Sequence, residues 1–261
     1  MNEIVLNEKE WAKRAIDSLS LGKKPYETIV RVAKYYKAQG CGKADVRRKV
    51  EDFMIRCDPK LSLVKWEGAI ESAVIAAEKY KLINLSGITI TVPEMNTIKS
   101  LSSIIQQRLM FTLLCLAKYG NAVNERNGGW VNLSQRDIFA LANITLTTKR
   151  QSLAINDLWQ AGLVGYSCLV DNINLQVKII EDGDEAITIS DFRNLGNQYM
   201  RYISSDYVEC ESCGIVIKKD TKHAGRPTKY CKECANIIKA SRDSDRNYIN
   251  RMSREFLKTS Q

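Results

Sequence analysis

Four cysteines in the last fifth of the sequence constrain the fold of this chain most. They form two Cys-x-x-Cys pairs, Cys210 with Cys213 and Cys231 with Cys234, and 17 residues separate one pair from the other. Two residues between paired cysteines let both thiolates face one ion, and two such turns together complete a tetrahedral shell of four sulfurs. The spacing therefore predicts a zinc ribbon that holds one structural Zn²⁺ ion through all four cysteines. An iron–sulfur cluster or redox-active cysteines are the alternatives, because four thiolates alone do not exclude iron.

The predicted metal site has a structural rather than a catalytic character. Four thiolates fill the coordination shell and leave no position for water, so we expect no reaction at the metal. The single histidine, His223, lies between the two pairs and follows neither spacing, so we interpret it as an exposed loop residue. The surrounding residues 208–261 contain few large apolar side chains. Metal binding worth on the order of 10 kcal/mol would supply the stability that burial cannot.

The net charge of +9 is concentrated at the two ends of the chain. Residues 1–92 carry a net charge of +5, residues 93–207 of −1, and residues 208–261 of +5. Lysine and arginine that neutralise phosphates release counterions, so a basic protein favours a polyanionic partner. The charge distribution therefore indicates nucleic acid as a candidate partner.

Composition and hydropathy indicate a soluble, cytoplasmic protein without a membrane partner. The chain of 261 residues is 44% hydrophobic and 26% charged, as in ordinary globular proteins. It does not open with a basic start followed by an apolar stretch, and no apolar run approaches the roughly 18 residues of a membrane-spanning helix. The eight cysteines of such a chain are not expected to form a disulfide framework.

Residues 1–92 are predicted to form a small helical bundle. Apolar residues recur at helical spacing, Pro25 suits a first helical turn, and Asp58-Pro59 stops the third helix. The expected helices cover residues 8–18, 26–38, 43–57 and 63–81. A basic cluster at the start of the third helix, partly cancelled by nearby acidic residues, comprises Lys43, Arg47, Arg48 and Lys49. This cluster is either a solvated face or a nucleic-acid contact.

Residues 93–207 follow the element order of a winged helix-turn-helix. A short edge strand or connector over residues 83–93 separates them from the bundle. Ser134 is predicted to cap the helix that follows it. Residues 158–164 resemble a signature of that fold, in which the second helix ends at a glycine, here Gly162, before an apolar wing strand. The expected elements are helix 98–119, strand 130–132, helices 135–142 and 147–161, strands 163–167, 175–180 and 187–189, and helix 192–203 capped by Asp191.

The winged-helix resemblance implies a recognition helix that begins near Thr147. Its exposed hydrogen-bonding side chains would then be Thr148, Lys149, Arg150, Ser152 and Asn156. Lysine and arginine suit phosphates or guanine edges, and asparagine suits adenine. Winged helices also serve protein contacts, and the acidic run over residues 181–185 would repel a nearby phosphate backbone. A DNA contact and a protein contact through this helix therefore both stay open.

Residues 235–258 are predicted to form a basic amphipathic helix. Four cationic residues fall on one row with four-residue spacing, Arg242, Arg246, Arg254 and Lys258. Apolar residues occupy another face at Ile238, Ile249, Met252 and Phe256. Such a helix can lie along a phosphate backbone, a membrane surface or an acidic partner, or its apolar row can dock on the body of the protein. We interpret the cationic row as a candidate nucleic-acid contact.

The run Gly-Arg-Pro-Thr-Lys-Tyr-Cys over residues 225–231 leads into the second cysteine pair. It is similar to a run in small zinc-ribbon proteins of phages and integrating elements of Gram-positive bacteria. With the helical amino-terminal region and the winged-helix-like middle, it resembles a group of such mobile-element proteins that are uncharacterised. The resemblance covers most of the chain and implies the order of its parts, but it implies no activity.

The sequence thus predicts a mainly α protein with small β elements: a helical bundle (1–92), a winged helix-turn-helix (93–207) and a zinc ribbon with a basic helix (208–261). We expect a zinc-containing protein of a phage or mobile element that binds nucleic acid, double-stranded DNA rather than RNA, in transcription or replication control. A protein-binding adaptor or inhibitor that acts on a host or phage protein is the alternative. An enzyme is not expected, because one histidine and no recognisable phosphate loop or nucleophile motif leave no catalytic constellation.

Overall fold

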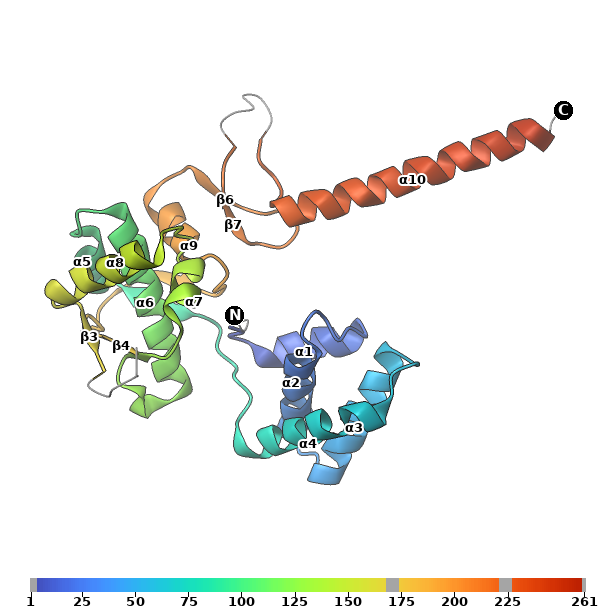
Figure 1. Ribbon diagram of the computed structural model, residues 1–261, viewed down its shortest axis with the longest axis horizontal. Coiled ribbons are helices and arrows are strands. Elements are labelled where there is room, and N and C mark those ends of the chain that lie inside the picture. The colour runs from blue at the N-terminus through green and yellow to red at the C-terminus, as the bar shows by residue number, and fades with distance from the viewer. Residues whose placement is uncertain (1–3, 168–173, 221–226, 260–261) are drawn as a thin grey trace. The chain divides into compact units, whose positions relative to one another are not determined.

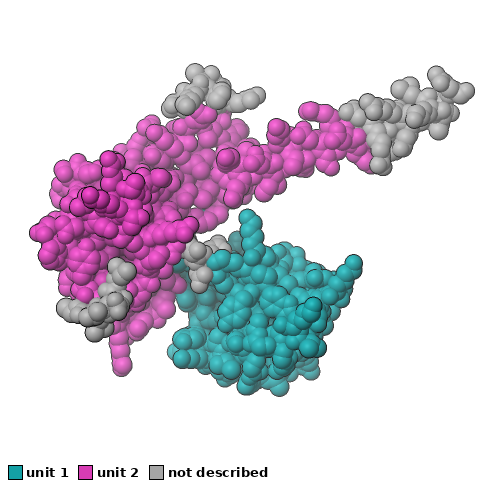
Figure 2. Space-filling model, viewed as in Figure 1, with its two compact units in different colours: residues 1–89, 188–191 teal, residues 90–187, 192–261 magenta. Residues whose placement is uncertain are grey.

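The computed structural model describes residues 4–167, 174–220 and 227–259, with side chains up to residue 249. Over these ranges the chain is mainly helical with three small sheets, which confirms the expected fold class at this level (Figure 1). The chain divides into two compact units, residues 1–89 with 188–191, and residues 90–187 with 192–261 (Figure 2). No helix in the described ranges is both long and apolar enough to cross a membrane. A separate domain over residues 208–261 stays a prediction.

Unit 1 consists mainly of four helices whose ends lie within two residues of the expected ones. Helices α1 to α4 span Glu8–Asp17, Pro25–Ala38, Lys43–Cys57 and Leu63–Lys79. The apolar stripe of α2, with Ile29, Val32 and Ala33 fully buried, packs with the stripes of α3 and α4 in one core. Each large apolar side chain buried in this way contributes about 1.5–3 kcal/mol, so the helical spacing of these residues determines how the four helices associate.

A buried ion pair ties the start of α1 to the rest of unit 1. The carboxylate of Glu8 pairs with the ammonium of Lys34 on α2, and both residues are 7% exposed. The backbone N–H of Ile83 donates to the same carboxylate at 2.9 Å, and the N–H of Glu8 donates to the Ile83 carbonyl at 2.8 Å. A buried charge is tolerated when it is paired and hydrogen-bonded, so these contacts are structural.

The start of unit 2 contains a helix that the sequence did not predict. Strand β1 (Ile88–Thr91) pairs with β5 (Glu185–Ile189), and the boundary between the units runs through both strands. Helix α5 (Val92–Lys99) follows β1 directly, so the last two residues of the expected connector over 83–93 already belong to a helix. The cause is a capping box, in which Glu94 accepts a hydrogen bond from the Thr91 N–H at 2.8 Å.

Glu94 is also a buried junction within unit 2. Its side chain is fully buried, and it pairs with the ammonium of Lys118 at 2.8 and 2.9 Å. The backbone N–H of Glu181 donates to the same carboxylate at 3.1 Å. One side chain therefore joins α5, the long helix α6 (Ile104–Val123) and the segment before β5.

The expected helix over 98–119 is wrong at its start, because the chain breaks between α5 and α6. Ser103 caps α6 and accepts a hydrogen bond from the Ile105 N–H at 3.3 Å, so the first turn begins after it. The side-chain amide of Gln107 donates to the Leu101 carbonyl at 2.6 Å and satisfies the backbone of the break. The apolar residues of α6 that fill the core of unit 2 include Leu109, Met110, Phe111, Leu113 and Leu114.

The elements after α6 occur in the predicted order. They are β2 (Trp130–Val131), α7 (Gln135–Leu141), α8 (Thr148–Gln160), β3 (Val164–Tyr166) and β4 (Leu175–Val177). The three strands form an antiparallel sheet in the order β2-β4-β3. The predicted cap is confirmed, since Ser134 accepts a hydrogen bond from the Asp137 N–H at 3.1 Å. Gly162 ends α8 with a φ of +74°, as the sequence indicated.

Helix α9 (Leu195–Ile203) begins three residues later than expected, so the predicted cap by Asp191 is wrong. The cause is Phe192, which is 2% exposed and packs its ring edge-on against Tyr119 at 5.6 Å between centroids. Asn194 then enters the helix in a left-handed conformation, with a φ of +52°. Burial of one aromatic side chain therefore outweighs the capping preference of an aspartate.

Candidate metal centre and nucleic-acid interface

The first cysteine pair lies in the turn between two short antiparallel strands of unit 2. Strand β6 (Tyr207–Glu209) pairs with β7 (Val216–Lys218). Within the turn, the N–H of Gly214 donates to the Cys210 carbonyl at 2.8 Å. Gly214 has a φ of +74°, a conformation that strains a residue with a side chain. The glycine therefore lets the turn fold tightly enough to bring Cys213 back toward Cys210.

The second cysteine pair lies at the start of the last helix, α10 (Lys232–Thr259). The N–H of Cys231 donates to the Sγ of Cys210 at 3.2 Å, and the N–H of Cys234 donates to the Sγ of Cys231 at 3.4 Å. Backbone N–H groups aimed at sulfur favour the thiolate form, as does the positive end of a helix. The backbone of this segment is therefore already arranged to hold anionic sulfur.

The four cysteine sulfurs form one cluster, as the spacing predicted. All four lie within 4.8 Å of one another, and the Sγ atoms of Cys213 and Cys231 are 3.8 Å apart. A tetrahedral zinc site with bonds of about 2.3 Å has sulfur–sulfur edges of about 3.8 Å. Cys210 and Cys234 are buried, and the other two are half-buried. The cluster is thus consistent with a single metal ion, and zinc fits its donor set.

The protein environment distributes charge unevenly over the four thiols. Burial opposes ionisation of Cys210, but hydrogen bonds from the backbone N–H groups of Cys231, Cys213 and Ser212 outweigh it and lower the pKa of Cys210 to about 6. The Ser212 side chain favours the thiolate of Cys234, but hydrogen bonds shared with the other thiols raise the pKa of Cys234 to about 12. The backbone N–H groups around Cys210 thus favour its thiolate form, and a bound cation would have to displace the thiol protons of the cluster.

Helix α9 anchors the cysteine turn to the rest of unit 2. The side-chain amide of Asn197 donates to the Val216 carbonyl at 3.0 Å, and Asn143, after α7, donates to Asn197 Oδ1 at 2.9 Å. The guanidinium of Arg193 donates to the Cys213 carbonyl at 2.6 Å. Nothing in the local sequence distinguishes Asn197 from a surface asparagine, because its role depends on residues far along the chain.

The exposed face of α8 carries the side chains predicted to meet nucleic acid. Thr148, Lys149, Arg150 and Ser152 are exposed and Asn156 is half-buried, whereas Ala154, Ile155 and Leu158 are buried. Ser152 donates to the Thr148 carbonyl at 3.2 Å, within the helix itself. The side chains of Lys149 and Arg150 form no ion pair or hydrogen bond with other described residues. Two cationic side chains at the first turn of α8 are therefore available to a ligand.

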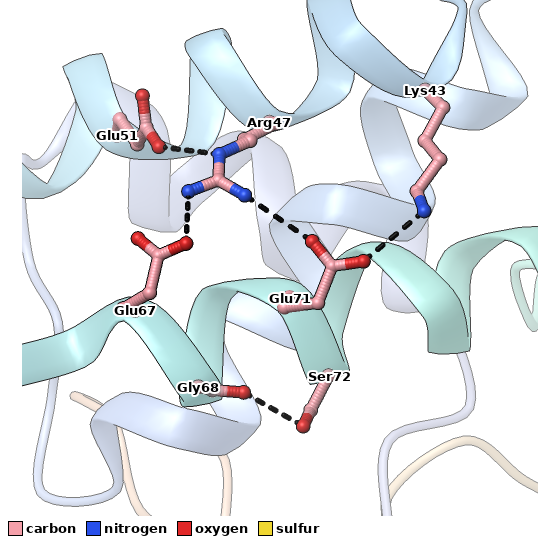
Figure 3. Close-up of polar contacts among 7 residues, drawn as sticks. All are labelled: Lys43, Arg47, Glu51, Glu67, Gly68, Glu71 and Ser72. Carbon is pink, nitrogen blue, oxygen red and sulfur yellow. Dashed lines mark hydrogen bonds and ion pairs between the residues drawn. The ribbon is translucent and has the colours of Figure 1, made fainter.

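The basic cluster of unit 1 is largely neutralised by its neighbours (Figure 3). Arg47 donates to Glu51 on its own helix at 2.8 Å and also pairs with Glu67 and Glu71 on α4. Hydrogen bonds to Glu67 and then Glu51 raise the pKa of Arg47, which stays charged. Lys43 pairs with Glu71 at 3.1 Å.

The two remaining cations of this cluster are engaged as well. Arg48 pairs with Asp45 at 2.8 Å, and the ammonium of Lys49 lies 4.9 Å from the centre of the Tyr36 ring. The sequence left open whether this cluster is a solvated face or a nucleic-acid contact. Each of its cations already has a partner of opposite charge or an aromatic face, so the structure favours a solvated face over a phosphate contact.

Several predicted positions near the carboxyl-terminal end lie outside what the structure describes. Arg242 and Arg246 are exposed on α10, and Arg246 lies 4.0 Å from Asp243. The side chains of Arg254 and Lys258 lie outside the described residues, although the backbone there is helical. His223 also lies outside the described residues.

Comparison with known proteins yields no match: no family model, curated protein sequence or solved structure is similar to this chain. The geometry and charge of these sites are therefore the basis for any functional inference.

Proposed function

We propose that this chain is a zinc-stabilised protein that binds double-stranded DNA through a winged helix-turn-helix, in transcription or replication control of a phage or mobile element. The observation that carries the proposal is the Lys149–Arg150 dipeptide at the first turn of α8, which is exposed and whose side chains have no partner among the described residues. Helices α6 and α7 and the sheet β2-β4-β3 accompany α8 in the element order of a winged helix. In that fold the second helix of the helix-turn-helix enters the major groove.

The residue types on α8 suit two kinds of DNA contact. Lys149 and Arg150 can neutralise phosphates or form bidentate bonds with guanine, and helix N-termini also bind phosphate through free N–H groups. Asn156 lies two turns further along the helix, where its amide can pair with adenine. Because its exposure is partial, we assign it the lesser contribution.

Zinc would have a structural role in this proposal. Cys210, Cys213, Cys231 and Cys234 would hold one Zn²⁺ ion and so fasten the β6–β7 turn to the start of α10. Asn197 connects β7 to Asn143 at the end of α7. Loss of the ion would therefore loosen the cysteine turn first and leave the α6–α8 core in place.

The test measures DNA affinity of the zinc-loaded protein at several salt concentrations. The assay is fluorescence anisotropy with random duplex and single-stranded oligonucleotides. We expect binding to the duplex, with an association constant whose logarithm falls linearly with the logarithm of the salt concentration. The slope of this line should be about −0.9 for each phosphate contacted. The double variant Lys149→Ala/Arg150→Ala should weaken binding at least about tenfold and reduce the slope by up to about 1.8.

A matched control makes the result specific to α8. Lys13 and Arg14 form the same dipeptide on an exposed part of α1, so Lys13→Ala/Arg14→Ala removes equal charge elsewhere. We expect the control to retain wild-type affinity and slope. An unchanged slope in the α8 variant would show that this helix does not contact phosphate.

A protein-binding adaptor is the second candidate, and specific observations favour it. Leu153, Trp159 and Tyr166 are 53%, 44% and 40% exposed on α8 and β3, and the acidic residues 181–185 are exposed as well. Exposed aromatic and aliphatic side chains are typical of protein interfaces, whereas acidic residues repel DNA. Retention of a host protein in a pull-down that survives nuclease and high salt, with loss in Trp159→Ala, would favour this function.

A further inference from the structure

One stripe along α10 repeats at alternating steps of three and four residues. Its positions are Ala235, Ile238, Arg242, Asp245, Ile249 and Met252. This spacing is the heptad pattern of coiled coils, which keeps every position of the stripe on the same side of a helix. Arg242, Asp245 and Ile249 are exposed, Ile249 at 61%, so the described part of the stripe lies largely open. Such a stripe requires a partner helix to become buried.

Two charges of opposite sign occupy the middle of this stripe. Arg242 and Asp245 occupy two successive positions of the stripe, with Ile238 before them and Ile249 after them. In a coiled coil these positions form the seam, the line along which the two helices meet. Neither charge has a partner among the other described residues. A polar pair at the seam of a coiled coil sets the register and the direction of the helices, because the charges must meet their complements when the seam is desolvated.

The charge pattern is complementary to itself in one direction. If two copies of α10 run antiparallel about the point between Asp243 and Ser244, Arg242 of each copy lies opposite Asp245 of the other. The same register places Ile238 opposite Ile249 and Ala235 opposite Met252, so every seam position meets a suitable partner. A parallel arrangement would align Arg242 with Arg242 and Asp245 with Asp245, and like charges at a seam repel.

We propose that α10 forms an antiparallel coiled coil with α10 of a second copy of this chain, with two Arg242–Asp245 pairs at its centre. The inference does not depend on whether the protein binds DNA. It assigns Arg242 to the dimer seam, whereas Arg246 lies beside the stripe, 4.0 Å from Asp243. The seam contains few apolar layers, so the dimer dissociates on dilution.

The experiment is sedimentation equilibrium on the full zinc-loaded chain over a wide concentration range. The average mass of the wild type should rise from 29.6 kDa toward twice that value. Arg242→Asp places four carboxylates at the seam and Asp245→Arg places four cations there, so each variant should raise the dimer dissociation constant at least about tenfold. Asp243→Arg makes the same charge change as Asp245→Arg at a position outside the stripe, so this control variant should dimerise as the wild type does.

Mixing the two seam variants separates pairing between chains from misfolding or pairing within a chain. One variant carries aspartate at both positions and the other arginine at both, so an equimolar mixture should form a heterodimer although each alone is monomeric. A wild type that stays monomeric at every concentration would overturn the proposal. A mixture that stays monomeric, or seam variants that dimerise as the wild type does, would overturn it as well. The proposal is equally refuted if Arg242→Asp lowers DNA affinity and leaves the mass of the protein unchanged.

Discussion

Replacement of Gly196 by alanine tests a close backbone approach in unit 2. A Cβ atom at this position of α9 would lie 1.8 Å from the carbonyl oxygen of Ala142, which ends α7. Real Cβ atoms essentially never come closer than 3.0 Å to another heavy atom, so one backbone must move by at least 1.2 Å, the difference between the two distances. The obstacle is a main-chain group and cannot rotate away as a flexible side chain would.

The free energy of this change follows from the contacts that such a shift breaks. Arg108 donates to the Ala142 carbonyl at 2.8 Å, and Asn197, beside Gly196, donates to Val216 at 3.0 Å. A hydrogen bond from a charged group contributes about 1.5–3 kcal/mol and a neutral one about 1 kcal/mol. We therefore expect Gly196→Ala to lower the free energy of unfolding of unit 2 by about 3 kcal/mol or more.

A second glycine provides the matched control with the opposite sign. Gly68 lies inside α4, and a Cβ atom there meets nothing within 4 Å. Alanine is favoured over glycine in a helix interior by about 1 kcal/mol, so Gly68→Ala should stabilise unit 1. The same substitution is thus expected to act in opposite directions at two helical sites.

Hydrogen exchange measured by mass spectrometry reports on each unit separately, which matters because a chain of two units need not unfold in one step. At about 1.4 kcal/mol per factor of ten, the slowest amides of α6 should exchange roughly a hundred times faster in Gly196→Ala. Those of α2 should exchange several times more slowly in Gly68→Ala. Wild-type exchange in α6 of the Gly196 variant would refute the close approach of α9 to α7.

Three further predictions concern the metal and the buried polar groups. Elemental analysis of the purified protein should find one Zn²⁺ per chain, and Cys213→Ser or chelation should speed exchange in β6 and β7 while α6 stays protected; an iron–sulfur absorption spectrum would contradict the zinc assignment. Glu94→Ala should destabilise unit 2 by about 3–5 kcal/mol because it leaves Lys118 and two backbone N–H groups unpaired, and normal thermal stability of the variant would argue against that junction. Burial raises the pKa of the Cys115 thiol, so iodoacetamide should modify the half-buried Cys41 in the native state and Cys115 only after unfolding, as peptide mass mapping would record.

Local signals account for the elements that the sequence predicted well. Helix α3 starts after Gly42 and ends before Asp58-Pro59, and both its ends agree with the prediction. The cysteine pairs behave likewise, because each turn is determined by residues that are neighbours in sequence. The arrangement of these elements depends instead on groups such as Asn197, whose partners lie 19 and 54 residues away.

The errors occur where tertiary contacts outweigh a continuous helical pattern. The apolar spacing continues from Ile98 through Leu101 into α6, so nothing in the pattern indicates a break. The break forms because Ser103 caps the new helix and Gln107 satisfies the freed carbonyls of Leu101 and Lys99. The capping pair Thr91-x-x-Glu94 was a usable signal for α5, since serine or threonine three residues before glutamate is typical of a helix start.

The charge clusters show why linear charge patterns predict binding surfaces poorly. Lys43 and Arg47 belong to the densest basic run of unit 1, yet they pair with Glu67 and Glu71 of α4, which lie 20 to 28 positions further along the chain. A phosphate that binds these cations would have to displace those carboxylates. Each displacement gives up the attraction between the cation and its carboxylate, which reduces the net gain from the phosphate contact. Lys149 lies in a region of net negative charge, yet its side chain forms no ion pair with any carboxylate of the described residues. Availability to a polyanion therefore depends on which cations the fold leaves without a carboxylate, and on that criterion α8 is a better candidate than α3.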